Sequence, residues 1–228
     1  MKKIIFLLLF ASSSLIFSQN IAFEQVAIKV KPGSSAHVLN LFNGFYGNIE
    51  KPEGVNIRLS YLNFRSQDIK ATHYLTFTGS IEGLAKLREI RGGDKYSLYN
   101  SNMLRHADII STSGGTSLMR MNLNKGNQPI SQVWRWRVDD PASFASEFTT
   151  LIKAFTQLGY LSLGQITHGI GQDGESHYVY MTHKDYSGAL GWGPKTQAEQ
   201  QAFLKFQKAT SKYSTFLGSV TMSNIKVW

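Results

Sequence analysis

The chain contains no cysteine among its 228 residues, and it has only five prolines. Without cysteine it has no disulfide bonds, no thiolate metal sites and no cysteine nucleophile, so packing alone must stabilise the fold. The sequence also lacks a Walker-type phosphate loop, a His-Glu-x-x-His zinc motif and a Gly-x-Ser-x-Gly elbow. These absences argue against P-loop nucleotide, zinc-protease and serine-hydrolase chemistry.

Long hydrophobic runs are also scarce, and the strongest one stands at the N-terminus. Lys2 and Lys3 precede an apolar run over residues 4–10, and small residues follow at 11–14. A membrane anchor needs about 20 apolar residues, whereas this run is short and interrupted by serines. The order is typical of a signal peptide over residues 1–18. We therefore expect a periplasmic or secreted mature protein with no membrane partner after cleavage.

The charge balance is moderately basic. Lysine and arginine number 24 against 15 acidic residues, a formal net charge of +9. The basic residues are scattered along the chain, and such an excess usually marks a solvated surface rather than a nucleic-acid footprint. We therefore expect no nucleic-acid partner.

The chain resembles itself at a spacing of 104 residues, which indicates an internal duplication. Residues 72–75 (Thr-His-Tyr-Leu) match residues 176–179 (Ser-His-Tyr-Val). The same spacing aligns Gly114 with Gly218. Further upstream the spacing becomes 107 or 108, where Gln25-Val26 echoes Gln132-Val133 and Val30 echoes Val138. The sequence thus predicts a first repeat over residues 19–126 and a second over 127–228.

Each repeat shows the same order of elements, because alternating apolar residues predict strands and 3.6-residue periodicity predicts helices. In the first repeat we expect strands at 23–31, 55–64, 71–78 and 116–123, a helix after residue 34, and a helical region over 81–109. In the second we expect strands at 133–138, 160–168, 177–182 and 218–228, and helices after residue 140 and over 196–211. Asp140 before Pro141 is a good helix start, since the carboxylate can cap free amides.

The order strand, helix, strand, strand, helix, strand, found twice over residues 21–228, is that of the ferredoxin-like unit. In this order the chain resembles a tandem member of the dimeric α/β-barrel superfamily, which includes antibiotic-biosynthesis-monooxygenase-like proteins. The resemblance implies an α+β fold of two tandem ferredoxin-like βαββαβ repeats, with antiparallel sheets packed as an intramolecular α/β barrel. Ligands would then sit between sheet and helices or in the barrel, and the protein would be a monomer or a homodimer.

The resemblance leaves the activity open, because a fold does not determine function. The superfamily includes cofactor-free oxygenases, haem-handling enzymes and proteins of no known activity. Haem is therefore a possible cofactor, although nothing in the sequence requires one. Whether the protein is an enzyme is left undecided by the sequence.

Two histidines flank a glycine-rich turn in the second repeat. If the turn is Gln172-Asp173, His168 and His177 lie opposite each other on one sheet face. Two imidazoles on one face could bind a metal or haem iron, or one could act as a base. A metal site normally needs a third protein ligand, and none is identifiable in the sequence. The alternative is a purely structural role, which is favoured because His73 occupies the position of His177 in the first repeat.

The segment Trp134-Arg135-Trp136-Arg137 alternates between aromatic and cationic residues. If the tryptophans pack under the helices, Arg135 and Arg137 point to the face where the two sheets meet. The reverse orientation would put both tryptophans in the barrel, where they would suit an aromatic ligand. Such arginines need an anionic partner, either an acidic side chain or a ligand. Trp192, in the glycine-rich stretch 188–193, belongs either to a mobile lid over a pocket or to an ordinary anchored loop.

Our leading hypothesis is an exported small-molecule-binding protein whose ligand is anionic or aromatic. Its predicted site lies on the second repeat and comprises Arg135, Arg137, His168, His177 and Trp192. The alternative is a cofactor-independent monooxygenase or haem-linked oxidoreductase that uses His168 or His177 for catalysis. RNA binding ranks last: the strand order also builds the RNA-recognition fold, and Tyr74 and Phe77 faintly echo its aromatic strand.

Overall fold

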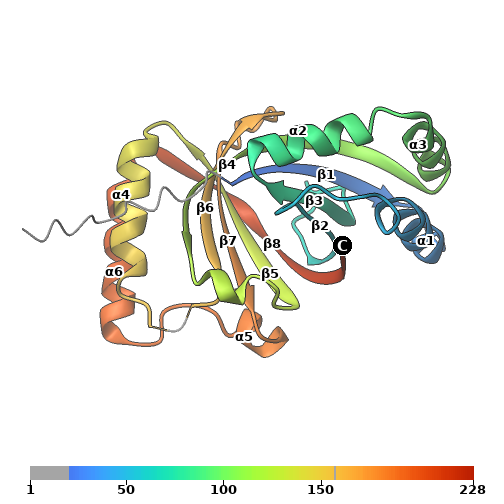
Figure 1. The fold of residues 1–228 in the computed structure, drawn as a ribbon. Helices are drawn as coiled ribbons and strands as arrows, with labels where there is room; N and C mark the ends of the chain where they lie inside the picture. Colours follow the sequence, from blue (N-terminus) through green and yellow to red (C-terminus); the bar gives the residue numbers. More distant parts are fainter. Residues whose placement is uncertain (1–20, 157) are drawn as a thin grey trace, which may run out of the picture.

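A computed structural model describes residues 21–156 and 158–228 as an eight-stranded closed barrel with six α-helices on its outside (Figure 1). The predicted signal peptide, residues 1–18, lies outside the described residues. Within the described ranges, no helix has the length and apolar character needed to cross a bilayer.

The two predicted repeats each contribute four strands. The first repeat comprises β1 (Ala22–Val30), α1 (Ser35–Tyr46), β2 (Asn56–Phe64), β3 (His73–Gly79), α2 (Ile81–Ile90), α3 (Asp94–His106) and β4 (Ala107–Met121). A 3-10 turn at Leu123–Lys125 follows it. The second repeat comprises β5 (Ile130–Val138), α4 (Pro141–Ile152), β6 (Leu161–His168), β7 (His177–His183), α5 (Tyr186–Leu190), α6 (Gln197–Thr210) and β8 (Ser214–Val227).

The barrel closes through pairings between the two repeats. The strand order is β1-β3-β2-β8-β5-β7-β6-β4, and every neighbouring pair is antiparallel. Within each repeat the order is that of the ferredoxin-like unit, with the first strand next to the last and the third strand next to the second. The pairs β2–β8 and β4–β6 then join the two sheets, so no second subunit is needed for closure. The predicted fold class is therefore confirmed.

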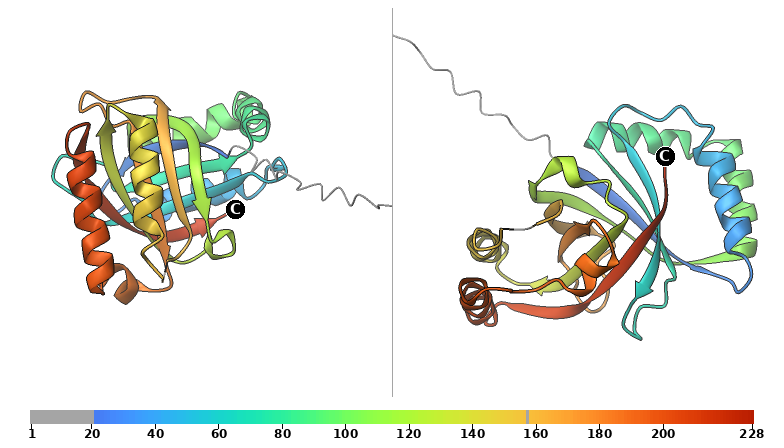
Figure 2. Two further views of the ribbon diagram at one scale, coloured as in Figure 1. Left: turned by 90° about the vertical axis from the view of Figure 1, so that its left-hand side faces the viewer. Right: turned by 90° about the horizontal axis from the view of Figure 1, so that it is seen from below.

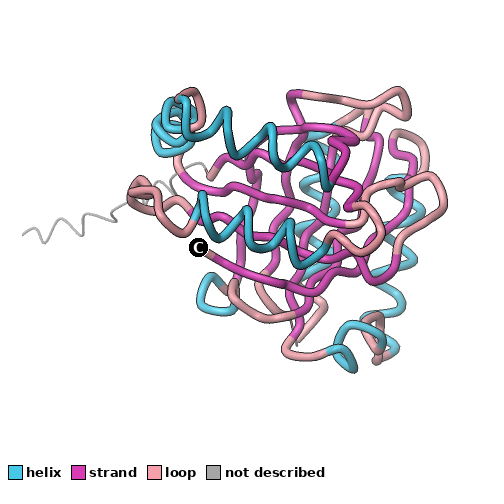
Figure 3. Tube along the Cα trace, turned by 90° about the vertical axis from the view of Figure 1, so that its right-hand side faces the viewer, coloured by secondary structure: helices cyan, strands magenta, loops and turns pink. Residues whose placement is uncertain are grey.

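Helices cover the outer face of each sheet. The helices of the two repeats lie on opposite sides of the barrel (Figure 2), and Figure 3 shows the helices of the first repeat in front of their sheet. One hydrophobic core fills the space under α1, α2 and α3, around Phe42 and Phe77. A second fills the space under α4 and α6, around Phe144 and Phe206. Because strand residues alternate, the inner faces of both sheets point into the barrel.

The strand pairing shows which residues are equivalent in the two repeats. Tyr74 pairs with Ala27, and Tyr178 pairs with Arg135, so Ala27 and Arg135 occupy the same position. This supports the spacing of 108 rather than 107 at the first strand. In both repeats the pairing to the last strand shifts directly after this position, at a β-bulge.

The predicted match of Gly114 with Gly218 is wrong by three residues. Ala27 pairs with Ser111, whereas Arg135 pairs with Gly218, so Ser111 is the structural equivalent of Gly218. The cause is the connection between the third and last strands, which is three residues longer in the second repeat.

A hydroxyl and a histidine make the same contacts in both repeats. The Oγ1 atom of Thr72 accepts a hydrogen bond from the N–H of the last residue of β1 (2.9 Å) and lies 2.8 Å from Nδ1 of His73. The Oγ atom of Ser176 accepts one from the N–H of the last residue of β5 (2.9 Å) and lies 3.0 Å from Nδ1 of His177. The duplicated pair therefore ties two strands together, which supports a structural role for both histidines.

The largest error in the predicted elements concerns the last strand of each repeat. The helical region was expected to reach residue 109, but α3 ends at His106 and β4 begins at Ala107. Ile109 and Ile110 continue the apolar pattern of the helix in sequence, yet they are half exposed and belong to β4. Pairing with β1 therefore overrides the local pattern. Likewise β8 begins at Ser214 rather than at residue 218.

Candidate functional site

The interior of the barrel is a cavity of about 730 Å³. Inward-facing residues of all eight strands line it, together with the β2–β3 and β6–β7 loops and the segment between the repeats. This volume suits a small organic ligand. The residues that carry the argument below are Phe23, Arg58, Tyr74, Arg135, Tyr178 and Tyr180.

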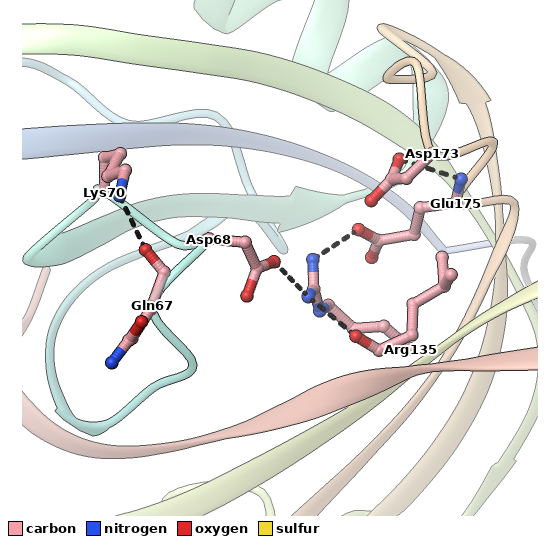
Figure 4. A network of polar contacts seen from close by, with 7 residues as sticks. Gln67, Asp68, Lys70, Arg135, Asp173 and Glu175 are labelled. Carbon is pink, nitrogen blue, oxygen red and sulfur yellow. Dashed lines mark hydrogen bonds and ion pairs between the residues drawn. The ribbon is translucent and has the colours of Figure 1, made fainter.

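Arg135 lies inside the cavity, as predicted for a sheet whose tryptophans pack under the helices. It donates to Oε2 of Glu175 (3.0 Å), to Oδ2 of Asp68 (3.4 Å) and to the carbonyl oxygen of Leu217 (3.3 Å). Figure 4 shows the guanidinium between the two carboxylates. Asp68 comes from the first repeat and Glu175 from the second, so this cluster joins the repeats. From the sequence, the anionic partner of Arg135 was either an acidic side chain or a ligand. In the structure its partners are two acidic side chains.

Glu175 is the more enclosed of the two carboxylates. Burial raises the pKa of its carboxyl group, and the guanidinium of Arg135 acts in the opposite direction. Asp68 is largely exposed, and its pKa is lowered, chiefly by a hydrogen bond from Ser66. The charge of Arg135 is thus already balanced by the protein itself.

Arg58, on β2, presents a second guanidinium to the cavity. Its nitrogen atoms donate to the phenolic oxygen of Tyr180 and, over 3.0 Å, to the carbonyl oxygen of Gly126. Both acceptors are neutral. Within residues 21–156 and 158–228, Arg58 forms no ion pair with a carboxylate, in contrast to Arg135. Arg58 therefore places an unbalanced positive charge on the cavity wall.

A group of hydroxyls from both repeats also lines the cavity, on β4 of the first repeat and at β6 and β7 of the second. The hydroxyl groups of Ser117 and Ser162 are hydrogen-bonded to each other, with their Oγ atoms 2.8 Å apart. Both serines also hydrogen-bond the hydroxyl of Tyr178. Tyr160 contacts the ring of Tyr180 at a centroid distance of 5.9 Å. Burial raises the pKa values of Tyr160 and Tyr178, so both phenols stay protonated at neutral pH and act as neutral hydrogen-bonding groups.

Gly164 is required beneath the ring of Tyr178. The two residues pair across β6 and β7, and a β-carbon on Gly164 would overlap the phenol ring. On the other side, the ring of Phe23 meets Tyr178 edge to face at 5.1 Å. The absence of a side chain at position 164 therefore determines where the aromatic wall of the cavity stands.

Of the five predicted site residues, only Arg135 lines the cavity. Arg137 is exposed and donates to Oγ1 of Thr215 (3.1 Å), because it lies beyond the β-bulge towards the open end of β5. Trp192 packs between Trp134, at 4.6 Å, and the stacked ring of Phe155, in the core under the helices. Trp192 thus anchors an ordinary loop.

The two predicted histidines are not brought together. The loop between β6 and β7 spans residues 169–176 instead of a two-residue turn, so His177 pairs with Gln165 and His168 pairs with Gly114 of β4. His177 is 1% exposed in the second core and near Phe144, and its Nε2 atom has no hydrogen-bond partner among the described residues. Burial lowers its pKa.

His168 lies in a separate groove outside the barrel. This groove, of about 530 Å³, runs between α2 and the outer faces of β1 and β4. Nδ1 of His168 lies 2.9 Å from the hydroxyl of Thr167. Among the described residues, no cluster of three His, Asp or Glu side chains is arranged to hold a metal ion.

The aromatic pair considered for RNA recognition is not on a common surface. Tyr74 points into the barrel, whereas Phe77 is fully buried under the helices of the first repeat. Neither ring stands on an open sheet face, which stacking on bases requires. The RNA-binding interpretation depended on these two aromatic residues, and neither is placed where it could stack on a base.

Arg58 was not among the predicted site residues, although the sequence of β2 contains a signal for it. In β2 the residues Asn56, Arg58 and Ser60 alternate with the apolar residues Ile57 and Leu59. A polar face on a strand of a closed barrel points inward rather than to solvent. The signal becomes readable only when closure of the barrel is taken into account.

The chain has no match among protein-family models or curated proteins. Solved structures do match in fold. A candidate monooxygenase from Lactobacillus acidophilus NCFM aligns with a TM-score of 0.59 and 10% identity, over 91% of this chain and 95% of its own. An anthrone oxidase-like protein gives 0.57 and 10%, over 93% and 94%. A candidate chlorite dismutase gives 0.51 and 12%, over 90% and 95%. At such identities the likeness concerns the fold alone.

Proposed function

We propose that this chain, whose fold is that of the dimeric α/β-barrel superfamily, is an exported protein that binds a small anionic molecule inside its barrel. The observation that carries the proposal is Arg58, a cation in the cavity whose partners, Tyr180 and Gly126, are both neutral. A guanidinium out of bulk water gains most from a carboxylate, phosphate or sulfonate that accepts its remaining N–H groups.

The rest of the cavity supports the same ligand class. Arg120 also lines it and hydrogen-bonds Tyr160, which in turn contacts Tyr180, so a second cation stands near the first. The rings of Phe23 and Tyr178 offer apolar surface for the body of a ligand. Arg135 contributes less, because Glu175 and Asp68 already neutralise it.

The test is a titration with the anionic fluorophore anilinonaphthalene sulfonate. Replacing Arg58 with Gln is expected to weaken binding by about thirtyfold, since a lost charge-assisted hydrogen bond costs about 2 kcal/mol. Arg137→Gln is the matched control, because the same change is made to an exposed arginine outside the cavity. Equal affinities for the wild type and Arg58→Gln would remove the proposal.

A second candidate function is cofactor-independent oxygenation of an aromatic substrate. Glu175 favours it, because this carboxylate lines the cavity and burial raises its pKa, which makes it a stronger base. The likeness of the fold to a candidate monooxygenase and an anthrone oxidase-like protein suggests the substrate class to try. Oxygen uptake with an anthrone, abolished by Glu175→Gln, would support this candidate. Uptake no faster than in buffer would eliminate it.

The residues of the barrel cavity do not fit a haem. No histidine lines the cavity in the part of the chain that the structure describes. The chain has no cysteine either, so a thiolate ligand is excluded as well. No chemical step is therefore assigned to haem.

Export is part of the proposal and is supported by the order of residues 1–18 alone. N-terminal sequencing of the protein recovered from the extracytoplasmic fraction of its host should begin at Gln19. A chain that retains Met1 and stays in the cytoplasm would contradict export without affecting the argument on the cavity.

A further inference from the structure

The cavity wall beside Arg58 carries a continuous row of polar side chains. Arg58 on β2 pairs with Thr76 on β3, Thr76 pairs with Gln25 on β1, and Gln25 pairs with Ser113 on β4. All four line the cavity. Adjacent strands lie about 4.8 Å apart, so the row extends over about 14 Å.

The three neutral members of this row are available to a ligand. Gln25, Thr76 and Ser113 are half-buried, and none of their side chains has a hydrogen-bond partner among the described residues. Each can both donate and accept a hydrogen bond. By contrast, the hydroxyls of Ser117 on β4 and Ser162 on β6 are already engaged with each other.

A purely apolar ligand body would leave this row without water and without partners. Burying an unsatisfied amide or hydroxyl is unfavourable, so the row discriminates against such a ligand. A ligand with several hydroxyl groups satisfies the row, and its C–H faces can lie against the rings of Phe23 and Tyr178. Sites built to bind ligand hydroxyls reject analogues that lack them.

We propose that the ligand is a polyhydroxylated carboxylate of the sugar-acid class, with its carboxylate on Arg58 and its hydroxyls on Thr76, Gln25 and Ser113. This inference rests on the proposed function, because it takes Arg58 as the anion-binding group. It adds the chemical class of the ligand body and the wall that recognises it.

Calorimetric titration with three probes tests the sugar-acid inference separately from the proposed anion site at Arg58. Glucuronate carries both features, cyclohexanecarboxylate keeps the ring and charge without hydroxyls, and glucose keeps the hydroxyls without charge. We expect glucuronate to bind at least tenfold more tightly than either of the others. Equal binding of cyclohexanecarboxylate and glucuronate would overturn the sugar-acid inference and leave the anion site standing. Equal binding of glucose would overturn both. No binding of any probe would overturn the sugar-acid inference, and the anion site would then depend on the fluorophore titration alone.

Glucose 6-phosphate identifies the anion, since a guanidinium accepts phosphate as well as carboxylate. Tighter binding of this probe than of glucuronate would overturn the assignment to a carboxylate. Weaker binding supports it.

The variant Gln25→Leu tests the row directly and leaves Arg58 in place. It should weaken glucuronate binding by about tenfold, the size expected for one lost hydrogen bond, and leave cyclohexanecarboxylate binding unchanged or stronger. Gln207→Leu, the same change at an exposed site on α6, is the control. Unchanged glucuronate binding by a folded Gln25→Leu protein would overturn the role of the row. If Gln25→Leu does not fold, the smaller change Ser113→Ala replaces it with the same expectation.

Discussion

The two repeats build the same sheet but place different side chains on its inner face. Arg58 of the first repeat corresponds to Ser162 of the second, because these residues pair with Thr76 and Tyr180, which are themselves equivalent. Conversely, Arg135 of the second repeat corresponds to Ala27 of the first. Arg58 and Arg135 therefore each stand at a position where the other repeat has a small residue.

This difference distinguishes the residues that maintain the fold, which are alike in both repeats, from the residues that line the cavity, which are not. Contacts on the outer side of the sheets are duplicated: the hydroxyl–histidine pairs of Thr72-His73 and Ser176-His177 hold the same strands in both halves. Inside the barrel the pseudo-symmetry is broken, so that a balanced cluster around Arg135 stands opposite an unbalanced Arg58. The divergence lies where a ligand would be recognised.

The largest effect is expected when a residue of the first repeat is placed in the second. Ser60 and Gly164 are equivalent, since they pair with Tyr74 and Tyr178 respectively. Gly164→Ser would drive a side chain into the ring of Tyr178 and should lower the free energy of unfolding by about 3 kcal/mol. The reverse change, Ser60→Gly, removes one hydrogen bond to Asn224 and should cost about 1 kcal/mol. Urea unfolding measures both, and equal losses would refute the difference in packing.

A smaller effect is expected when Arg135 is changed to Ala, the residue of the first repeat at this position. The change leaves Glu175 partly buried without its cation, at a cost of about 2 kcal/mol in the free energy of unfolding. Combining it with Glu175→Gln should recover part of this loss, because the isolated carboxylate is then removed. A double mutant whose loss equals the sum of the two single losses would show that the pair is not coupled.

Acidification should act on both repeats, through their equivalent histidines. Burial, with a smaller contribution from Arg65, lowers the pKa of His73 to about 4, and burial lowers the pKa of His177. Unfolding returns both to about 6.5, so the unfolded chain binds more protons below that pH. The free energy of unfolding should therefore be highest above pH 6.5 and fall as the pH drops towards 4, with a loss from His73 of about 2 kcal/mol by pH 5 and a further loss from His177.

Urea unfolding at pH 7.5 and pH 5 measures this loss. His73→Gln and His177→Gln should each make the free energy of unfolding less dependent on pH, whereas the exposed His168→Gln should not. A steeper pH dependence in either of the first two variants would contradict the buried neutral state.

Local patterns were enough to predict the order of elements and the duplication, but not the partners of the site. The alternation of Trp134 to Arg137 separated an aromatic face from a cationic face, but it did not indicate which of the two packs under the helices. The turn between His168 and His177 was misjudged because the glycine-rich residues 169–174 permit several turn lengths. Arg58 was missed because its partner Tyr180 lies 122 residues further along the chain and meets it only when the barrel closes.

The smallest effect is expected at the first helix of each repeat. The carboxylate of Asp140 accepts a hydrogen bond from the N–H of Ser143 (3.1 Å) and caps α4, as its position before Pro141 predicted. Ser34, at the same place before α1, makes no such side-chain bond. Asp140→Ala should lower the melting temperature by a few degrees, whereas Ser34→Ala should leave it unchanged. Calorimetry on the two variants would contradict the comparison if both lowered it equally, because the caps of the two repeats would then be equivalent.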